Sequence, residues 1–148
     1  MITMLIIDTN VWVSGLLFGG TPKEVFRTLR DGRGWAYLSN DQMGELIDVL
    51  SGAKLTRRLR ELHVSVIELV EDIQRMSVHL PVHEQPFVPS LRDQDDLHLL
   101  AAAKASLRQI LPAQAIITGD LDLLVLEEFE GIPIMNPTQW LAARKERE

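Results

Sequence analysis

The chain has 148 residues, no cysteine and a formal net charge of -6 at pH 7. Its length suits one domain, residues 1–148, with a core large enough to fold without disulfides or metal ions. The lack of cysteine excludes thiolate zinc sites and cysteine nucleophiles. The acidic balance argues against binding nucleic acid through bulk charge, but it leaves open an enzyme with an acidic metal site and a local basic rim. No apolar run approaches the roughly 20 residues that span a bilayer, and no basic signal region opens the chain, so we expect a soluble cytoplasmic protein.

The first predicted element is a strand over residues 4–7. Its apolar residues run without alternation, which is typical of a parallel strand that is covered on both faces. Asp8, Thr9 and Asn10 follow directly, so polar side chains stand where the strand ends. We expect this strand to be buried and to open into a site.

Two helices should follow this strand. The stretch 10–18 is apolar enough for a short helix, and the two glycines after it should end that helix. Thr21, Pro22 and Glu24 then have the spacing of a capping box with proline at the first helical position. The pattern predicts a helix that is capped by Thr21 and runs to about Arg30.

The aromatic and apolar run 35–39 predicts a second strand. A helix should then begin at Asn40 or Asp41. Its buried stripe should consist of Met43, Leu46, Ile47 and Leu50. Glu45 shares the opposite face with Asp41 and Asp48, which places it either in a polar site or on a solvated face.

The middle of the chain predicts a pair of helices, a weak strand and a long connection. Residues 54–62 and 64–76 have helical spacing. The cations of the first helix belong either to a solvated helix or to an RNA path beside an acidic centre. Residues 77–80 predict a weak third strand, and three prolines predict an extended connection over 81–92.

The last third of the chain predicts two helices and two strands. Acids at 93–96 precede an alanine-rich helix that should pack inside along nearly its whole length. A buried strand over 115–118 leads to Asp120 and a short helix. The proline-containing stretch 131–135 predicts a fifth strand at an edge of the sheet, and a final helix should begin near Pro137.

Strands and helices thus alternate five times, which predicts an α/β fold with a parallel sheet and right-handed crossovers. In an open parallel sheet the ligand crevice lies beyond the carboxyl ends of the strands, where the strand order reverses. Asp8 and Asp120 both stand at such ends, and we expect them to meet there. Glu45 and Asp96 should emerge from helices at the same edge.

These four carboxylates predict a metal site. Like charges in one crevice repel and raise one another's pKa values unless a cation neutralises them. Carboxylate oxygens without cysteine or a suitable set of histidines match Mg²⁺ or Mn²⁺ and not zinc. We therefore expect Asp8, Glu45, Asp96 and Asp120 to converge on a hard divalent cation.

Each acid also has a plainer explanation, and their conjunction favours a site more than any single acid does. Glu45 can be a solvated residue. An N-cap or a turn can account for Asp8, Asp93, Asp95, Asp96, Asp120 and Asp122. Because three of these acids adjoin one helix start, the register of the third ligand stays open among Asp93, Asp95 and Asp96.

The histidines do not complete a rival site. His79 and His83 are four residues apart, but the prolines around them forbid the helix that such zinc-type spacing needs. His98 should point to another side of its helix than Asp96. A P-loop and a Gly-x-Ser-x-Gly elbow are both missing, which argues against P-loop nucleotide hydrolysis and serine-type acyl transfer.

Five segments in order resemble the PIN-domain ribonucleases, in the branch of VapC-like toxins of type II toxin-antitoxin systems. The segments are 6–11, 45–50, 92–96, 117–124 and 134–141. They cover nearly the whole chain, and the ordered set is more specific than any one piece. The chain departs from the family pattern in a longer link at 106–112 and in Trp140, where phenylalanine is common.

The resemblance implies a three-layer α/β/α sandwich with a five-stranded parallel sheet in the order 3-2-1-4-5. It also implies an Mg²⁺- or Mn²⁺-dependent endoribonuclease. The family's catalytic and metal-binding quartet falls on Asp8, Glu45, Asp96 and Asp120. Its supporting polar positions fall on Asn10 and Thr118, with Asp122 as a further candidate acid. The implied partners are an RNA substrate, a cognate antitoxin protein and a second copy of the chain, and no membrane.

The expected chemistry is hydrolysis with one or two Mg²⁺ ions at the scissile phosphate, which leaves 5'-phosphate and 3'-hydroxyl ends. A different class stays open, namely a non-catalytic PIN-like or receiver-like module that only binds a partner. A phosphate-accepting receiver needs a lysine at a later strand end, and none stands at the end of the strand around Ile134. A haloacid-dehalogenase-like phosphatase needs Asp-x-Asp after the first strand, where this chain has Asn10 as the third residue.

Overall fold

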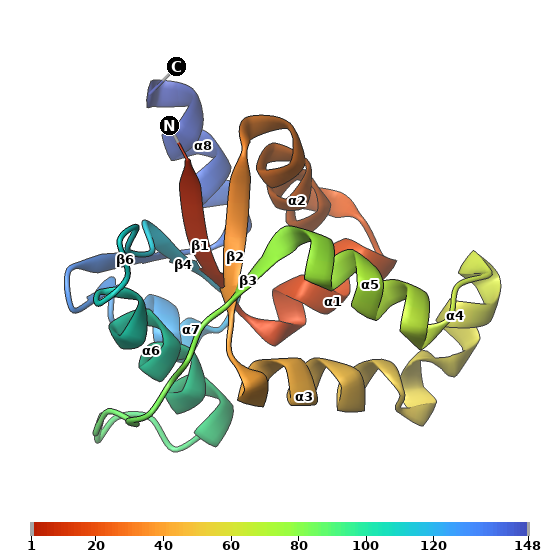
Figure 1. Cartoon of the computed structure of the whole chain (residues 1–148), viewed down its shortest axis with the longest axis horizontal. Helices are drawn as coiled ribbons and strands as arrows, with labels where there is room; N and C mark the ends of the chain where they lie inside the picture. Colours follow the sequence, from red (N-terminus) through yellow and green to blue (C-terminus); the bar gives the residue numbers. More distant parts are fainter. Residues whose placement is uncertain (1, 148) are drawn as a thin grey trace.

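The computed structural model describes residues 2–147, and a six-stranded sheet lies at its centre (Figure 1). The strands are β1 Thr3–Ile7, β2 Gly34–Leu38, β3 Ser77–His79, β4 Ala115–Ile117, β5 Glu128–Phe129 and β6 Ile132–Met135. Their spatial order is β3-β2-β1-β4-β6-β5. All pairings are parallel except that of β5 with β6. The predicted α/β fold and the order 3-2-1-4 are therefore confirmed.

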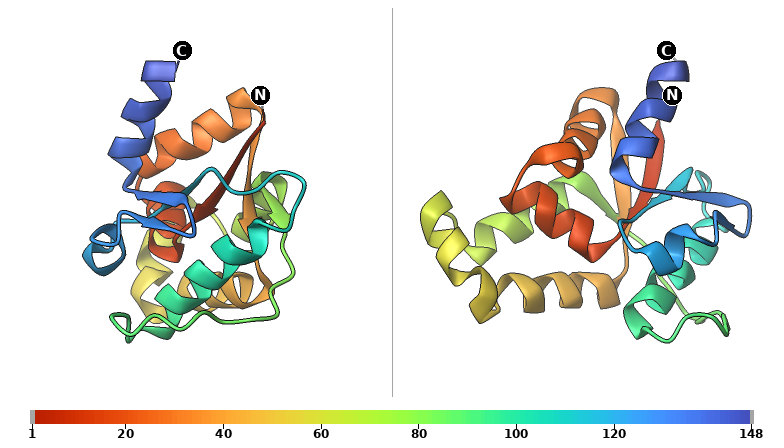
Figure 2. Two further views of the ribbon diagram at one scale, coloured as in Figure 1. Left: turned by 90° about the vertical axis from the view of Figure 1, so that its left-hand side faces the viewer. Right: turned by 180° about the vertical axis from the view of Figure 1, so that it is seen from behind.

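Helices cover both faces of the sheet (Figure 2). The α-helices are α1 Thr9–Leu17, α2 Gly20–Gly32, α3 Asn40–Leu50, α4 Thr56–Leu62, α5 Val66–Met76, α6 Gln94–Ser106, α7 Leu121–Leu124 and α8 Pro137–Arg147, with a short 3-10 turn η1 at Ala53–Leu55. One face packs against α1, α2, α3, α5 and α8. The other packs against α6 and α7 and against the connection that follows β3.

The side chains of β1 explain this layering. Leu5 and Ile7 belong to the hydrophobic core on one face, whereas Met4 and Ile6 belong to the core on the other face. All four are buried. The unbroken apolar run is thus a strand with two buried faces, as its pattern predicts.

The hairpin formed by β5 and β6 corrects the prediction of a five-stranded sheet with 131–135 at its edge. Phe129 pairs with Ile132, and the two residues between them, Glu130 and Gly131, both have positive φ angles. Such a two-residue turn matches the twist of an antiparallel pair. The sequence does not predict this turn, because Glu130-Gly131 is not one of the usual Asn-Gly or Asp-Gly turn pairs. As a result β5, and not β6, is the last strand on this side.

Two predicted helix details also need correction. Thr21 does not cap α2, which begins at Gly20 after Gly19 and has no side-chain cap; Glu24 instead pairs with Arg27 at 2.9 Å. Ile47 was expected in the buried stripe of α3, but it is 38% exposed. Gln42 is buried on that helix instead, because its side chain reaches the end of β1.

The remaining predicted elements are confirmed, with shifts of a few residues at their ends. Asp93 is the N-cap of α6, and residues 81–92 form an extended connection without regular structure. Among residues 2–147, none of the helices combines the length and apolar character that crossing a membrane requires.

Candidate active site

The candidate site lies beyond the carboxyl ends of β1 and β4. These strands are neighbours, and Ile7 pairs with Ile117, so the residues that follow them emerge side by side. Asp8 follows β1 and caps α1, accepting from the backbone N–H of Asn10 at 3.3 Å. Asp120 follows β4 and caps α7, accepting from the backbone N–H of Asp122 at 2.9 Å. Asp8 and Asp120 are therefore both N-caps and both lie at the shared edge of the sheet.

Thr118 connects these two acids. Its hydroxyl donates to Asp8 Oδ2 at 2.6 Å and accepts from the backbone N–H of Asp120 at 3.0 Å. The Thr118 side chain is fully buried, so this single hydroxyl determines how the two strand-end residues face each other. Asn10 takes part through its backbone and is exposed.

Asp96 lies against Asp120 at the start of α6. Its side chain is only 7% exposed. Burial, the negative charges of Asp120 and Asp93, a hydrogen bond with Asp120 and the charge of Asp8 together raise the pKa of Asp96 to about 7, with burial as the largest cause. A hydrogen bond between two carboxyl groups requires a proton on one of them. In the absence of a cation Asp96 therefore keeps its proton up to about neutral pH.

Glu45 faces Asp8 from the second turn of α3. Burial is the largest cause of a rise in the pKa of Glu45, the charges of Asp95, Asp8 and Asp93 add to it, and a hydrogen bond with Thr9 opposes it, so that the pKa stands at about 7. Burial also raises the pKa of Asp8, although its hydrogen bonds with Thr118 and Asn10 oppose that rise. The site thus concentrates more negative charge than its surroundings solvate.

A small pocket opens between these acids. It is lined by Asp8, Thr9, Gln42, Glu45, Asp95, His98 and Leu99 and measures about 10 Å³. That volume holds about one water molecule or a bare ion. Asp95 lines this pocket, whereas Asp96 turns toward Asp120, so two of the three candidates for the third acid adjoin the site from successive positions of α6.

Two residues of the pocket were missed by the sequence reasoning. His98 was expected on another side of its helix than Asp96 and was given no role, but it lies one turn after Asp95 and lines the pocket with it. Gln42 is one turn before Glu45 and is 5% exposed. The spacings of three residues were the available signals, since positions i and i+3 share a helix face. Asp122, a predicted further acid, is exposed in the first turn of α7 and does not line the pocket.

Gln42 leaves an oxygen without a partner at this pocket. Its side-chain amide donates to the backbone carbonyl of Ile7. Because that carbonyl can only accept, the amide nitrogen must face it and Oε1 must face away. Among the described residues Oε1 is buried with no hydrogen-bond partner. A buried acceptor of this kind is satisfied by a donor or a cation in the pocket.

The donor set fits a hard cation. Within residues 2–147, no three acidic or histidine side chains already stand together at metal-binding positions. Asp8, Glu45 and Asp95 surround the pocket, while Asp96 and Asp120 form a separate pair beside Asp8. Carboxylate oxygens with one unpartnered amide oxygen suit Mg²⁺ or Mn²⁺, and holding a cation would also remove the repulsion among these acids.

The comparisons with known proteins agree with this arrangement. A family model described as the PIN domain matches residues 4–122, which is most of the chain. The matched range begins in β1 and ends in α7, so it contains Asp8, Glu45, Asp96 and Asp120, whereas β5, β6 and α8 follow it. No curated protein matches the chain.

Proposed function

Because this chain belongs to the PIN domain family, most of whose members are metal-dependent nucleases, we propose that it is an endoribonuclease that hydrolyses RNA phosphodiester bonds with Mg²⁺ or Mn²⁺. The observation that carries the proposal is the gathering of Asp8, Glu45, Asp96 and Asp120 at one edge of the sheet, where burial and mutual repulsion raise the pKa values of Asp8, Glu45 and Asp96. Such perturbed carboxyl groups in one cleft are typical of functional sites.

Asp8, which adjoins both groups of acids, would hold the metal with Glu45 on one side and with Asp96 and Asp120 on the other. When bound, Mg²⁺ or Mn²⁺ supplies a Lewis acid that stabilises charge on the phosphate and favours hydroxide over water. The protein's own residues prepare the site for it. Thr118 orients Asp8 relative to Asp120 through two hydrogen bonds, and Gln42 offers the buried Oε1. Glu45 acts as a ligand or as the base that positions the attacking water, because a carboxylate with a raised pKa accepts a proton effectively near neutral pH.

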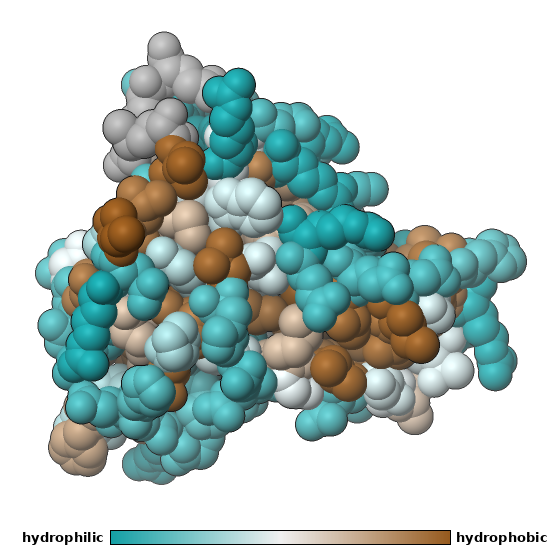
Figure 3. All heavy atoms as spheres, viewed as in Figure 1, coloured by the Kyte–Doolittle hydropathy of each residue, from teal (hydrophilic) through white to brown (hydrophobic). Residues whose placement is uncertain are grey.

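The proposal extends to a toxin of a toxin-antitoxin pair that acts in the cytoplasm as a homodimer. Its support is the resemblance of the sequence to VapC-like toxins, together with an apolar surface. Figure 3 shows apolar side chains gathered over α3 and α5. Ile47 and Val49 of α3 and Ile67 of α5 are among the exposed apolar residues. Exposed apolar side chains on neighbouring helices suit a protein partner, either the antitoxin or a second copy.

Cleavage of a mixed RNA tests the nuclease proposal. We would compare the wild type with Asp8→Asn and with Asp48→Asn, an exposed acid of the same region, in Mg²⁺, in Mn²⁺ and in chelator. We expect the wild type and Asp48→Asn to cut only with metal and to leave 5'-phosphate ends. Asp8→Asn should lose about 100-fold or more, since even supporting residues of metal sites can cost that much.

Full metal-dependent cleavage by Asp8→Asn would contradict this assignment. The alternative is a non-catalytic PIN-like or receiver-like module that binds a partner. The separation of the acids into a pocket group and the Asp96–Asp120 pair is the observation that keeps this alternative open. A wild type that binds metal but cuts no RNA in any condition would favour it.

A further inference from the structure

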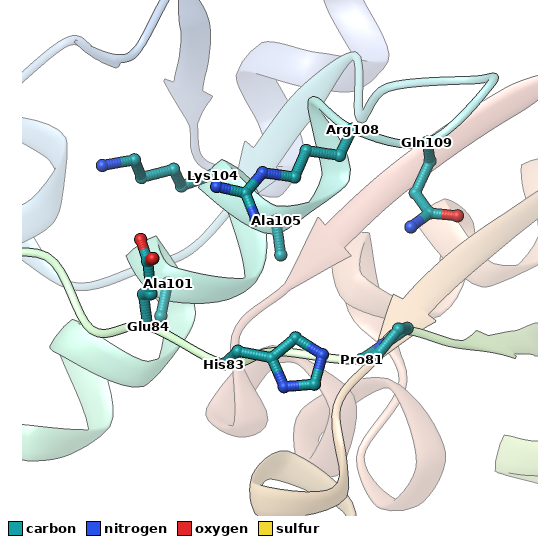
Figure 4. Close-up of a pocket in the computed structure, with 8 residues that line it drawn as sticks. All are labelled: Pro81, His83, Glu84, Ala101, Lys104, Ala105, Arg108 and Gln109. Atoms are coloured by element: carbon teal, nitrogen blue, oxygen red, sulfur yellow. The ribbon is translucent and has the colours of Figure 1, made fainter.

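A second pocket lies on the side of α6 that is far from the acids. It is formed by the last turns of α6 and by residues 81–84 of the connection after β3, and it measures about 120 Å³ (Figure 4). Lys104 lines it from the helix, Arg108 from the turn that follows the helix, and His83 and Glu84 from the connection. The volume admits several water molecules, and therefore also a group of phosphate size.

The cations of this basic pocket have no partner of their own. Lys104 and Arg108 are four residues apart, and both are exposed. In the described part of the chain neither forms an ion pair, and Glu84 forms none either. Figure 4 shows the guanidinium of Arg108 turned back over Ala105 toward Lys104, with the His83 ring below it. Two unpaired cations against one acid make a local positive site on a chain of net charge -6.

The basic pocket is linked to the acidic site by shared lining residues. A middle pocket of about 180 Å³ shares His83, Glu84 and Ala101 with the basic pocket, and it shares His98 with the acidic pocket. The three pockets therefore lie in series along α6. From Asp96 to Ser106, where α6 ends, the chain advances ten positions, or roughly 15 Å at helical rise. A single strand of a few nucleotides covers that length.

From this series of pockets and from the unpaired cations at its end, we infer that the basic pocket binds a backbone phosphate of the RNA strand, a few nucleotides away from the phosphate at the acidic site. The inference rests on the proposed function for the identity of the ligand. The acids repel a polyanion, so a substrate strand needs cations elsewhere along its path, and most of the affinity of such contacts is electrostatic. His98 and His83 both line the middle pocket. Histidine rings are surfaces on which unpaired bases stack.

The cations of α4 are a weaker candidate for this role. Arg57 and Arg58 both pair with Glu61. Arg58 also donates to the backbone carbonyl of Leu17 and lies over the ring of Phe18. Figure 1 shows α4 at the end of the molecule opposite to α6. Arg58 holds α4 against the end of α1, and Arg57 is paired within α4, which leaves the end of α6 as the better path.

Binding of a labelled single-stranded RNA of about 10 nucleotides tests the inference. The measurement uses the Asp8→Asn protein with Mg²⁺, so that RNA is not cut. Lys104→Gln/Arg108→Gln should raise Kd by about tenfold and lower the slope of log Kd against log salt by about 1. Glu84→Gln should lower Kd, because it removes the opposing charge. The matched control is Lys23→Gln/Arg30→Gln on α2, which carries the same charge change on the opposite face of the sheet.

Several results would overturn the inference. One is an unchanged Kd for RNA in Lys104→Gln/Arg108→Gln. Another is an equal rise of Kd in the α2 control, and a third is inorganic phosphate that binds the protein as tightly as RNA does. In the cleaving protein Lys104→Gln/Arg108→Gln should raise KM and leave kcat unchanged, because the contact is remote from the reacting bond. RNA binding that depends on Lys104 and Arg108 without any cleavage by the wild type would support this inference and contradict the proposed nuclease. RNA cleavage by Lys104→Gln/Arg108→Gln with an unchanged KM would support the proposed nuclease and contradict this inference.

Discussion

At the scale of single residues, the hydroxyl of Thr118 is the connection between the two strand-end acids. It donates directly to Asp8 and accepts directly from the backbone N–H of Asp120. A valine of the same shape would fill the buried space but break both hydrogen bonds. The site would then keep its carboxylates and lose the constraint on their relative orientation.

Thr118→Val should therefore reduce metal affinity or RNA cleavage by about 10- to 100-fold, the usual effect of removing a supporting residue at a metal site. Thr118→Ser keeps the hydroxyl and should retain most of the activity. The measurement is cleavage against Mg²⁺ concentration, together with a thermal unfolding curve for each variant. Equal activity of the valine and serine variants would show that Thr118 does not orient the acids.

At the scale of elements, α1 and α2 pack against each other through Gly15. The ring of Phe26, which is buried, lies where a side chain on Gly15 would stand. Phe26 also packs against Trp12 of α1, at a ring-centroid distance of 4.9 Å. The ring therefore has little room to move, and α1 carries Asp8 at its N-terminus.

Gly15→Ala should destabilise the protein by about 1–3 kcal/mol, the typical cost of overpacking a core. Gly44→Ala is a matched control within α3, because nothing lies within 4 Å of the position its methyl group would take. That control should stabilise by about 0.5–1 kcal/mol, since alanine loses less backbone entropy in a helix than glycine. Chemical denaturation of both variants measures the difference. If both substitutions stabilised the protein, the α1–α2 contact would be looser than described.

At the scale of the whole molecule, the buried acids couple stability to pH. The pKa of Glu45 rises from 4.5 to about 7 and that of Asp96 from 3.8 to about 7. The folded protein therefore binds more protons than the unfolded chain between about pH 4 and pH 7, and its stability falls as pH rises through this window. The contribution of protonated Glu45 and Asp96 to the stability of the folded protein is fully present below about pH 4 and is lost above about pH 7.

The metal-free protein should accordingly have a lower Tm at pH 8 than at pH 5.5. Mg²⁺ should raise Tm more at pH 8, where the carboxylates are charged, than at pH 5.5, where protons compete with the cation. Glu45→Gln/Asp96→Asn should flatten the pH profile, and Asp31→Asn/Asp48→Asn, which neutralises two exposed acids, should not. Thermal scans with and without chelator make the comparison. An Mg²⁺ effect of equal size at both pH values would contradict the proposed convergence of charge.

Much of the architecture follows from local patterns. The unbroken apolar run of β1 predicts a strand covered on both faces, and the acids after β1 and β4 predict polar side chains at one edge. Both rest on the alternation of side chains along a strand and on the common direction of parallel strands, which are properties of the chain itself. The β5–β6 hairpin has no such signal, since its Glu130-Gly131 turn is set by the pairing of its strands.

The division of the acids was decided by tertiary structure. Sequence alone placed Asp93, Asp95 and Asp96 before one helix and left their register open. The rotation of α6 against the sheet, with Leu99 and Leu100 packed inward, turns Asp96 to Asp120 and brings Asp95 and His98 to the pocket of Asp8 and Glu45. Gln42 is buried for a similar reason, because its amide meets a carbonyl left free at the end of β1. A residue's own sequence neighbourhood determines its element, but the phase of a helix against a sheet depends on contacts between residues distant in the chain.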